Sequence, residues 1–250
     1  NGAEVFISSV AGMTQLNALG QPIGEALPDW TPPPVPARAA LVGRWASLEP
    51  LDPARHGDEL WDAALQDPEG RSWTWLGDGP FESRAEFDAL LARNAAGADP
   101  MFFALRSAAT GRAEGSLMRI APSAGTIEVG WIWWGPRMQR TPAATEAIFL
   151  LMREVFRLGY RRFEWKCDTL NAASRAAAMR FGFSYEGVFR QAVVYKGRSR
   201  DTAWYAMIDR EAPRLEAAYA AWLDPANFDA EGRQKTRLAE LTAPVLVARG

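Results

Sequence analysis

The stretch GWIWWGPRMQRTPAATEAIFLLMREVF, residues 130–156, constrains the fold more than any other part of the chain. It begins as an apolar strand, passes through a proline-marked turn and continues as a long helix. Another strand pattern follows at residues 162–167. A strand–helix–strand connection within one sheet is right-handed and makes its two strands parallel. The sequence therefore predicts one parallel strand pair here.

The remaining patterns predict hairpins and helices around this crossover. Strands are expected at residues 44–48, 101–107, 113–120, 126–133, 185–195 and 201–208. Helices are expected from residues 53 and 83, at 142–158 and at 171–181. We therefore predict an α+β fold with a mixed, mostly antiparallel sheet, one parallel strand–helix–strand crossover and helices on both faces.

Three regions are expected along the chain. Residues 1–40 hold two parts. The residues before Met13, which is the expected native start, are an appended remnant, and residues 27–38, LPDWTPPPVPAR, form a proline-rich arm. The arm is a ligand for an aromatic groove of another protein or, as we favour, wraps its own domain with Trp30 as anchor. Residues 41–210 form the main domain. Residues 211–250 form a helical extension, with a last helix near 231–241.

Composition excludes several classes of function. The net charge is −2, which gives no basic field for a nucleic acid, and no apolar run approaches the ~20 residues of a membrane span. The chain has one cysteine, Cys167, and one histidine, His56, so an internal disulfide and a cysteine- or histidine-rich metal site are excluded. We expect no metal, a solvated His56 and a cytoplasmic protein. A homodimer is left open.

The turn before the long helix has the properties of an anion site. Thr141 stands where an N-cap belongs and Pro142 stands at the first helical position. The next residues are small, and their N–H groups lie at the positive end of the helix dipole. Two arginines add positive charge. The apolar strand upstream supplies a wall, so a ligand with an amide arm and a phosphate end is expected to fit. The positions concerned are Trp131, Ile132, Trp133, Trp134, Arg137, Arg140, Ala143, Ala144 and Thr145.

Four segments resemble motifs of the GNAT acetyltransferase superfamily, in particular the branch that acetylates ribosomal-protein N-termini. They are EVGWIWWGP (128–136), QRTPAATEA (139–147), LNAASRAAAMRFGF (170–183) and YKGRSRDTAWYAM (195–207). The resemblance covers residues from about 41 to 210. It implies the GNAT fold and an acetyl-CoA-dependent N-acetyltransferase. Its acceptor would be a protein or peptide N-terminus, or a small amine.

The resemblance also implies where acetyl-CoA would bind. The strand ending at Trp134 would bond the pantetheine amides, and residues 139–145 would hold the pyrophosphate. The family's first loop glycine falls on Pro142, which lacks an N–H. We expect weaker CoA binding unless Arg137 or Arg140 compensates. The implied cofactor-binding residues are Ile132, Trp133, Trp134, Arg137, Gln139, Arg140, Thr141, Ala143, Ala144, Thr145 and Asn171.

Glu128 and Ser174 are the candidate catalytic residues. Glu128 is a general base, acting directly or through a water, or an edge carboxylate in a salt bridge. Gly130 leaves room beside it for a substrate, and Trp131 is expected to line the acceptor site.

The tyrosine that often serves as general acid in the family corresponds to Ala178 here. Ser174 would then donate a hydrogen bond to the departing thiolate, or it bonds the helix backbone while solvent supplies the proton. Asn171 caps the helix, contacts pantetheine, or does both. The alternative function is a non-catalytic module that binds CoA or a peptide.

Overall fold

The computed structural model describes residues 15–120 and 125–250. The strands are β1 (Gln15–Leu16), β2 (Pro22–Ile23), β3 (Leu41–Val42), β4 (Ala46–Pro50), β5 (Met101–Ser107), β6 (Ala113–Ile120), β7 (Thr126–Trp134), β8 (Arg162–Asp168), β9 (Ser184–Tyr195) and β10 (Arg198–Ile208). The α-helices are α1 (Pro53–Leu65), α2 (Arg84–Ala96), α3 (Pro142–Arg157), α4 (Ala172–Phe181), α5 (Ala212–Leu223) and α6 (Leu238–Thr242). The short 3-10 helices are η1 (Arg71–Trp73), η2 (Asp209–Glu211) and η3 (Pro225–Asn227).

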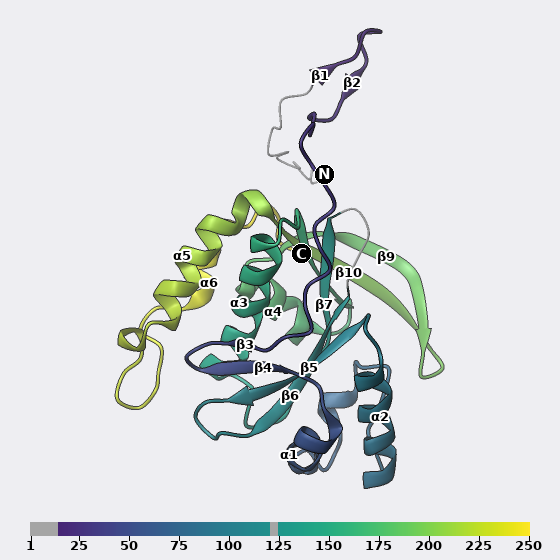
Figure 1. Cartoon of the computed structure of the whole chain (residues 1–250), viewed down its shortest axis with the longest axis vertical. Helices are drawn as coiled ribbons and strands as arrows, with labels where there is room; N and C mark the ends of the chain where they lie inside the picture. The colour runs from purple at the N-terminus through teal and green to yellow at the C-terminus, as the bar shows by residue number, and fades with distance from the viewer. Residues whose placement is uncertain (1–14, 121–124) are drawn as a thin grey trace, which may run out of the picture.

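One sheet organises the molecule, in the strand order β3-β4-β5-β6-β7-β8-β10-β9. Its neighbouring strands are antiparallel except for β7 and β8, which are parallel and joined through α3. Helices α1 and α2 cover one face, while α3 and α4 lie on the other with α5 and α6 packed outside them (Figure 1). The predicted α+β fold, with one parallel crossover and helices on both faces, is confirmed.

Local capping signals set the helix ends. The side chains of Asp52, Ser83, Thr141 and Asn171 each accept a backbone N–H of the helix that follows. Gly182 ends α4 with a left-handed φ of 98°, where a side chain would be strained. The expected helix near residues 231–241 is wrong in its first part. Only Leu238–Thr242 is helical, because residues 228–237 form a loop closed by a bridge between Phe228 and Gln234.

The proline-rich arm runs along its own domain. The Tyr160 hydroxyl donates to the Pro34 carbonyl at 3.1 Å, and the Arg38 guanidinium donates to the Leu51 carbonyl at 3.3 Å. Trp30 packs near Gly125, where an added Cβ would lie 3.2 Å from the indole. These contacts match the wrapping arm that the sequence favours. Met13 and the expected remnant lie outside the described residues.

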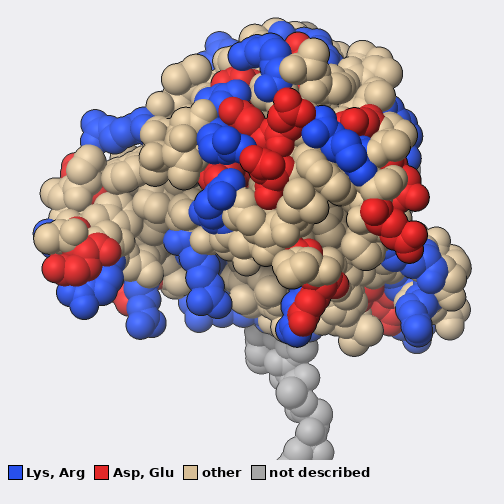
Figure 2. Space-filling view, turned by 90° about the horizontal axis from the view of Figure 1, so that it is seen from below, with Lys and Arg blue, Asp and Glu red and all other residues tan. Residues whose placement is uncertain are grey.

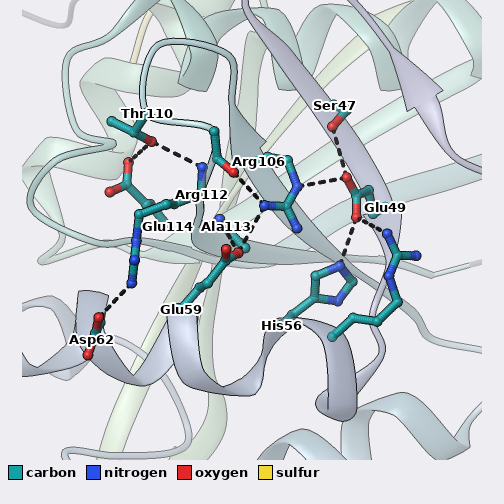
Figure 3. Close-up of polar contacts among 12 residues, drawn as sticks. Ser47, Glu49, His56, Glu59, Asp62, Arg106, Thr110, Arg112, Ala113 and Glu114 are labelled. Carbon is teal, nitrogen blue, oxygen red and sulfur yellow. Dashed lines mark hydrogen bonds and ion pairs between the residues drawn. The ribbon is translucent and has the colours of Figure 1, made fainter.

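His56 is buried, which contradicts the expectation of a solvated side chain. It is 0% exposed: Nδ1 accepts from the Asp52 backbone N–H at 3.0 Å, and Nε2 lies 2.9 Å from Glu49 Oε2. Arg106 Nε donates to the other oxygen of Glu49 at 2.9 Å (Figure 3). Burial opposes ionisation of Glu49, but the hydrogen bonds from Arg106 and His56 outweigh it and lower the pKa of Glu49 to about 2. This network fastens α1 to the sheet.

Glu49→Gln is expected to lower the free energy of unfolding by about 2–3 kcal/mol at neutral pH. Because the folded pKa lies below the unfolded value of 4.5, the carboxylate contributes fully above pH ~4.5 and loses its contribution as the pH falls towards 2. Urea unfolding between pH 2.5 and 7 measures this. Glu82→Gln, at an exposed position, is the control. A stability difference that does not change with pH would contradict the assignment.

Glu146 on α3 fastens the loop between β3 and β4. Its buried carboxylate accepts the backbone N–H groups of Arg44, Trp45 and Ala46 at 3.0, 2.5 and 2.8 Å. The carboxylate lies so close to Gly43 that a Cβ added there would clash with Glu146 Cδ. A carboxylate that accepts several backbone donors fixes the two elements that it joins. Glu146 therefore holds the edge of the sheet against α3.

Glu146→Ala is expected to destabilise the protein by about 3 kcal/mol, because three N–H groups lose their acceptor. Glu146→Gln keeps one acceptor oxygen and should cost less. The urea midpoints of the two variants, compared with the wild type, measure this difference. Equal midpoints for the wild type and Glu146→Ala would show that solvent replaces the carboxylate without cost.

The surface charge is mixed on the face that Figure 2 shows. Lysine and arginine side chains lie beside aspartate and glutamate side chains there and do not gather into a patch of one sign. Within residues 15–120 and 125–250, none of the helices has the length and apolar character needed to span a bilayer.

Candidate active site

The parallel strands β7 and β8 part halfway along their length. Their pairing runs from Thr126 opposite Arg162 to Val129 opposite Trp165, whereas β7 continues to Trp134 and β8 to Asp168. On the other edge of β7, the register with β6 shifts between Ser116 and Met118. Trp131 lies in this bulge with a left-handed φ of 46°. The parting strands open two adjoining hollows, the Glu128 pocket and the Arg140 cleft.

The Glu128 pocket has a volume of about 490 Å³ and aromatic walls. Its floor comes from β7, β8 and β10, and the segment after η1 adds another side. Gly130 keeps the space beside Glu128 open, because an added Cβ would lie 3.0 Å from Glu128 Oε1. The aromatic lining residues are Trp75, Trp131, Trp165, Phe189 and Trp204.

Glu128 is nearly buried, at 9% exposure. Burial raises the pKa of Glu128 above its ordinary value of 4.5, although the Lys166 ammonium 2.7 Å from Oε2 acts in the opposite direction. The other oxygen, Oε1, lies on the side of Gly130, where it would be the nearest atom to an added Cβ. Glu128 thus forms the salt bridge of one alternative and also lines the pocket with a carboxylate of raised pKa, while its role as a base stays a prediction.

The β9–β10 hairpin covers one side of the Glu128 pocket. The Tyr195 hydroxyl donates to buried Asp168 at 2.9 Å, and Lys196 Nζ donates to the Trp73 carbonyl at 2.8 Å. These two bonds tie the hairpin to the end of β8 and to η1. The pocket is therefore bounded by segments that are far apart in the sequence.

Ser174 and Asn171 lie where the two hollows meet, and both line each of them. Asn171 Oδ1 accepts the Ser174 backbone N–H at 3.0 Å, so Asn171 both caps α4 and faces the cleft. Ser174 Oγ accepts from Trp165 Nε1 at 3.1 Å, so its partner here is a side chain on β8. Burial raises the pKa of the neighbouring Cys167 thiol, although a hydrogen bond with Ser174 acts in the opposite direction.

The Arg140 cleft, with a volume of about 920 Å³, contains the start of α3. Thr141 Oγ1 accepts the Ala144 N–H at 3.3 Å and donates to the Met138 carbonyl at 2.8 Å. Arg140 has a left-handed φ of 62°. Residues in this conformation help to turn successive N–H groups to one side, which creates anion-binding concavities. The loop and the helix dipole together favour an anionic ligand.

Most residues predicted for the cofactor line this cleft. They are Ile132, Trp134, Gln139, Arg140, Thr141, Ala144, Thr145 and Asn171. Three others lie elsewhere. Arg137 forms an ion pair with buried Glu114, Ala143 is buried in the core, and the Trp133 indole stacks on Trp73 on the opposite face of the sheet. Only the backbone of Trp133 could face a ligand between the strands.

The cleft also contains basic residues that the sequence reasoning missed. Among the described residues, five arginines and no carboxylate line it. Arg140 was predicted; the others are Arg71, Arg180, Arg233 and Arg237. They come from η1, α4 and the segment before α6, and no local pattern marks them. Within the described ranges, no group of three His, Cys, Asp or Glu side chains is placed to hold a metal ion.

Comparison with known proteins identifies the family. Residues 47–184 match the acetyltransferase (GNAT) domain. A GCN5-related N-acetyltransferase from Brucella melitensis is 49% identical, with a TM-score of 0.84 over 87% of this chain and 100% of that one. A probable GNAT-family acetyltransferase from Chromobacterium violaceum is 41% identical, with a TM-score of 0.71 over 76% of this chain and 96% of its own.

The predicted branch is also represented among similar structures. RimL, a ribosomal L7/L12 alpha-N-protein acetyltransferase, is 25% identical, with a TM-score of 0.57 over 68% of this chain and 93% of its own. No curated protein matches the chain. The matched domain spans more than half of the chain, and the Brucella and Chromobacterium structures match it over most of its length. The chain belongs to the GNAT acetyltransferase family.

Proposed function

We propose that this chain is an acetyl-CoA-dependent N-acetyltransferase that acts on primary amines at the Glu128 pocket. One observation carries the proposal. A pocket with a buried carboxylate and a cleft lined by arginines share a boundary at Ile132, Trp165 and Ser174, where β7 and β8 part. An amine in the pocket and a thioester reaching along the cleft would meet at that boundary.

The residues of the cleft fit acetyl-CoA. Its phosphates are anionic, and the cleft offers the start of α3 together with Arg140 and further arginines without a lining carboxylate. The edge of β7 from Gly130 to Trp134 does not pair with β8. That edge suits the amides of the pantetheine arm, because unpaired strand edges bind extended amide chains.

The transfer needs a neutral amine that attacks the thioester carbonyl carbon. A new C–N bond forms and the C–S bond breaks. Glu128 takes the proton that the amine loses, directly or through a water, and its raised pKa favours this role. The Ser174 hydroxyl donates a hydrogen bond to the departing thiolate, and solvent supplies the proton that this thiolate takes up. An α-amine has a pKa of about 7.7–8.0 and needs less help than a lysine near 10.4.

The acceptor is proposed to be a protein or peptide N-terminus or a small amine. Several aromatic side chains line the pocket, and the Phe189 and Trp204 rings lie tilted against each other with their centres 5.0 Å apart. Such walls hold the apolar part of a side chain or a short peptide. RimL, named as a protein N-terminal acetyltransferase, supports the peptide alternative by similarity.

A second candidate is a non-catalytic module that binds CoA or a peptide. Ala178, fully buried in place of the family tyrosine, and Pro142 favour it. Two assays separate the candidates. Calorimetric titration with acetyl-CoA tests binding, and release of the CoA thiol in the presence of a panel of peptides and amines tests turnover. The enzyme requires both signals, and a module that binds CoA gives binding alone. No binding at millimolar acetyl-CoA contradicts both of these and leaves only a module that binds a peptide.

A further inference from the structure

The segment after α5 forms part of the wall of the Arg140 cleft. Trp222 at the end of α5, Phe228 and Arg237 all line the cleft. The family match ends at residue 184, so these residues lie outside the matched domain. The Trp222 and Phe228 rings meet edge to face with their centres 5.2 Å apart. The C-terminal segment thus adds its own side chains to a cleft that the matched domain alone does not complete.

Arg180 on α4 links this wall to the start of α3. Its guanidinium carbon lies 5.0 Å from the centre of the Trp222 ring, and Nη1 donates to Thr145 Oγ1 at 3.1 Å. None of the carboxylates in the described part of the chain forms an ion pair with Arg180 or Arg237. Burial lowers the pKa of Arg180, which is the expected sign for a cation that lacks a fixed counter-charge. An anion bound here would supply that charge.

The loop that carries these groups is held in place before any ligand binds. Asn227 Oδ1 accepts the Thr236 N–H at 2.9 Å, and Trp222 Nε1 donates to Gln234 Oε1 at 2.8 Å. Arg233, in contrast to Arg237, is neutralised within the loop by Asp229 and Glu231 at 2.7 and 2.9 Å. A pre-organised loop loses little entropy when it binds a ligand.

We propose that the C-terminal segment and Arg180 form a subsite for the 3′-phosphoadenosine end of acetyl-CoA, with Arg180 and Arg237 binding the 3′-phosphate. This inference rests on the proposed function. The thioester must lie at the boundary with the Glu128 pocket, and the start of α3 suits the pyrophosphate. The remaining anion of CoA is the 3′-phosphate. Of the other arginines that line the cleft, Arg71 pairs with Glu69 and Arg233 pairs within its loop, which leaves Arg180 and Arg237 for this phosphate. The half-buried Phe228 ring lines the cleft there and offers contact to the adenine.

The test compares acetyl-CoA with its 3′-dephospho form by calorimetric titration. The wild type is expected to bind acetyl-CoA about 10- to 100-fold more tightly than the 3′-dephospho form, because the dephospho form lacks the charged hydrogen bonds to the 3′-phosphate. Arg180→Gln and Arg237→Gln should each reduce this ratio by about tenfold and leave the affinity for the dephospho form nearly unchanged. Arg237 is exposed, so its variant should keep the fold. Arg233→Gln, the matched control, should change the ratio by less than about threefold.

Equal affinity of the wild type for the two forms would overturn the subsite and leave the acetyltransferase proposal intact. The subsite would also be overturned if both arginine variants kept the wild-type ratio of affinities for acetyl-CoA and its 3′-dephospho form. Binding of neither form would contradict the proposed function itself. Thiol release from acetyl-pantetheine, which lacks the nucleotide, shows whether the reaction site works without this subsite.

Discussion

Glu128→Gln is expected to reduce amine-dependent turnover by about 10²–10⁴-fold, the usual effect of removing a positioned general base. Glutamine keeps the size of the side chain but cannot accept the proton of the attacking amine. Affinity for acetyl-CoA should stay nearly constant, because Glu128 lines the pocket and not the Arg140 cleft. Steady-state thiol release gives the turnover, and calorimetry gives the affinity.

The dependence on pH adds a second test of the same residue. Burial raises the pKa of Glu128, so turnover should decline as the pH falls through that raised value and the carboxylate takes up a proton. In Glu128→Gln only the titration of the acceptor amine should remain. Glu164→Gln is the matched control for turnover: Glu164 lies opposite Glu128 in the strand register, bonds Arg162 and does not line the pocket, although its charge contributes to the raised pKa of Glu128. Turnover by Glu128→Gln equal to that of this control would contradict the role as base.

Arg140→Gly is expected to weaken acetyl-CoA binding by about 10- to 100-fold, because one charged hydrogen-bond donor to the pyrophosphate is lost. Glycine is the proper replacement, since Arg140 has a φ of 62° that glycine adopts without strain. The loop should therefore keep its shape. At saturating acetyl-CoA the turnover number should remain close to that of the wild type. Calorimetric titration measures the loss.

Two companion variants sharpen this result. Arg157→Gln removes a cation from the opposite end of α3, where it pairs with Glu154, and should leave binding unchanged. Pro142→Gly restores a backbone N–H at the start of the helix and should tighten binding, by up to about tenfold. If Arg140→Gly and Arg157→Gln bind acetyl-CoA equally well, the start of α3 does not hold the pyrophosphate.

The fold followed from local signals in the sequence. Thr141 and Pro142 mark the start of α3, Gly182 marks the end of α4, and the strand patterns on either side of α3 require one parallel pair. These signals act within a few residues, so a single sequence displays them. The residues of β7 and of the start of α3 that line the two hollows could be predicted for the same reason, helped by the resemblance to the family, and their roles stay predictions.

Residues with distant partners could not be placed in this way. Arg137 looked like a phosphate ligand because it precedes the helix, yet its partner is Glu114 on β6. The run of apolar residues at 131–134 does not reveal which side chain turns away, and Trp133 proves to stack on Trp73. His56 is buried because Glu49 on another element bonds its ring. The C-terminal contribution to the cleft likewise depends on tertiary packing.

The most direct test of the account is amide hydrogen exchange with and without acetyl-CoA. We expect protection at residues 130–134 of β7, at residues 139–145 and in the loop at 228–237, with smaller changes in α1 and α2. Such a pattern would place acetyl-CoA where β7 and β8 part. Protection confined to other elements, under conditions where calorimetry shows binding, would contradict the account.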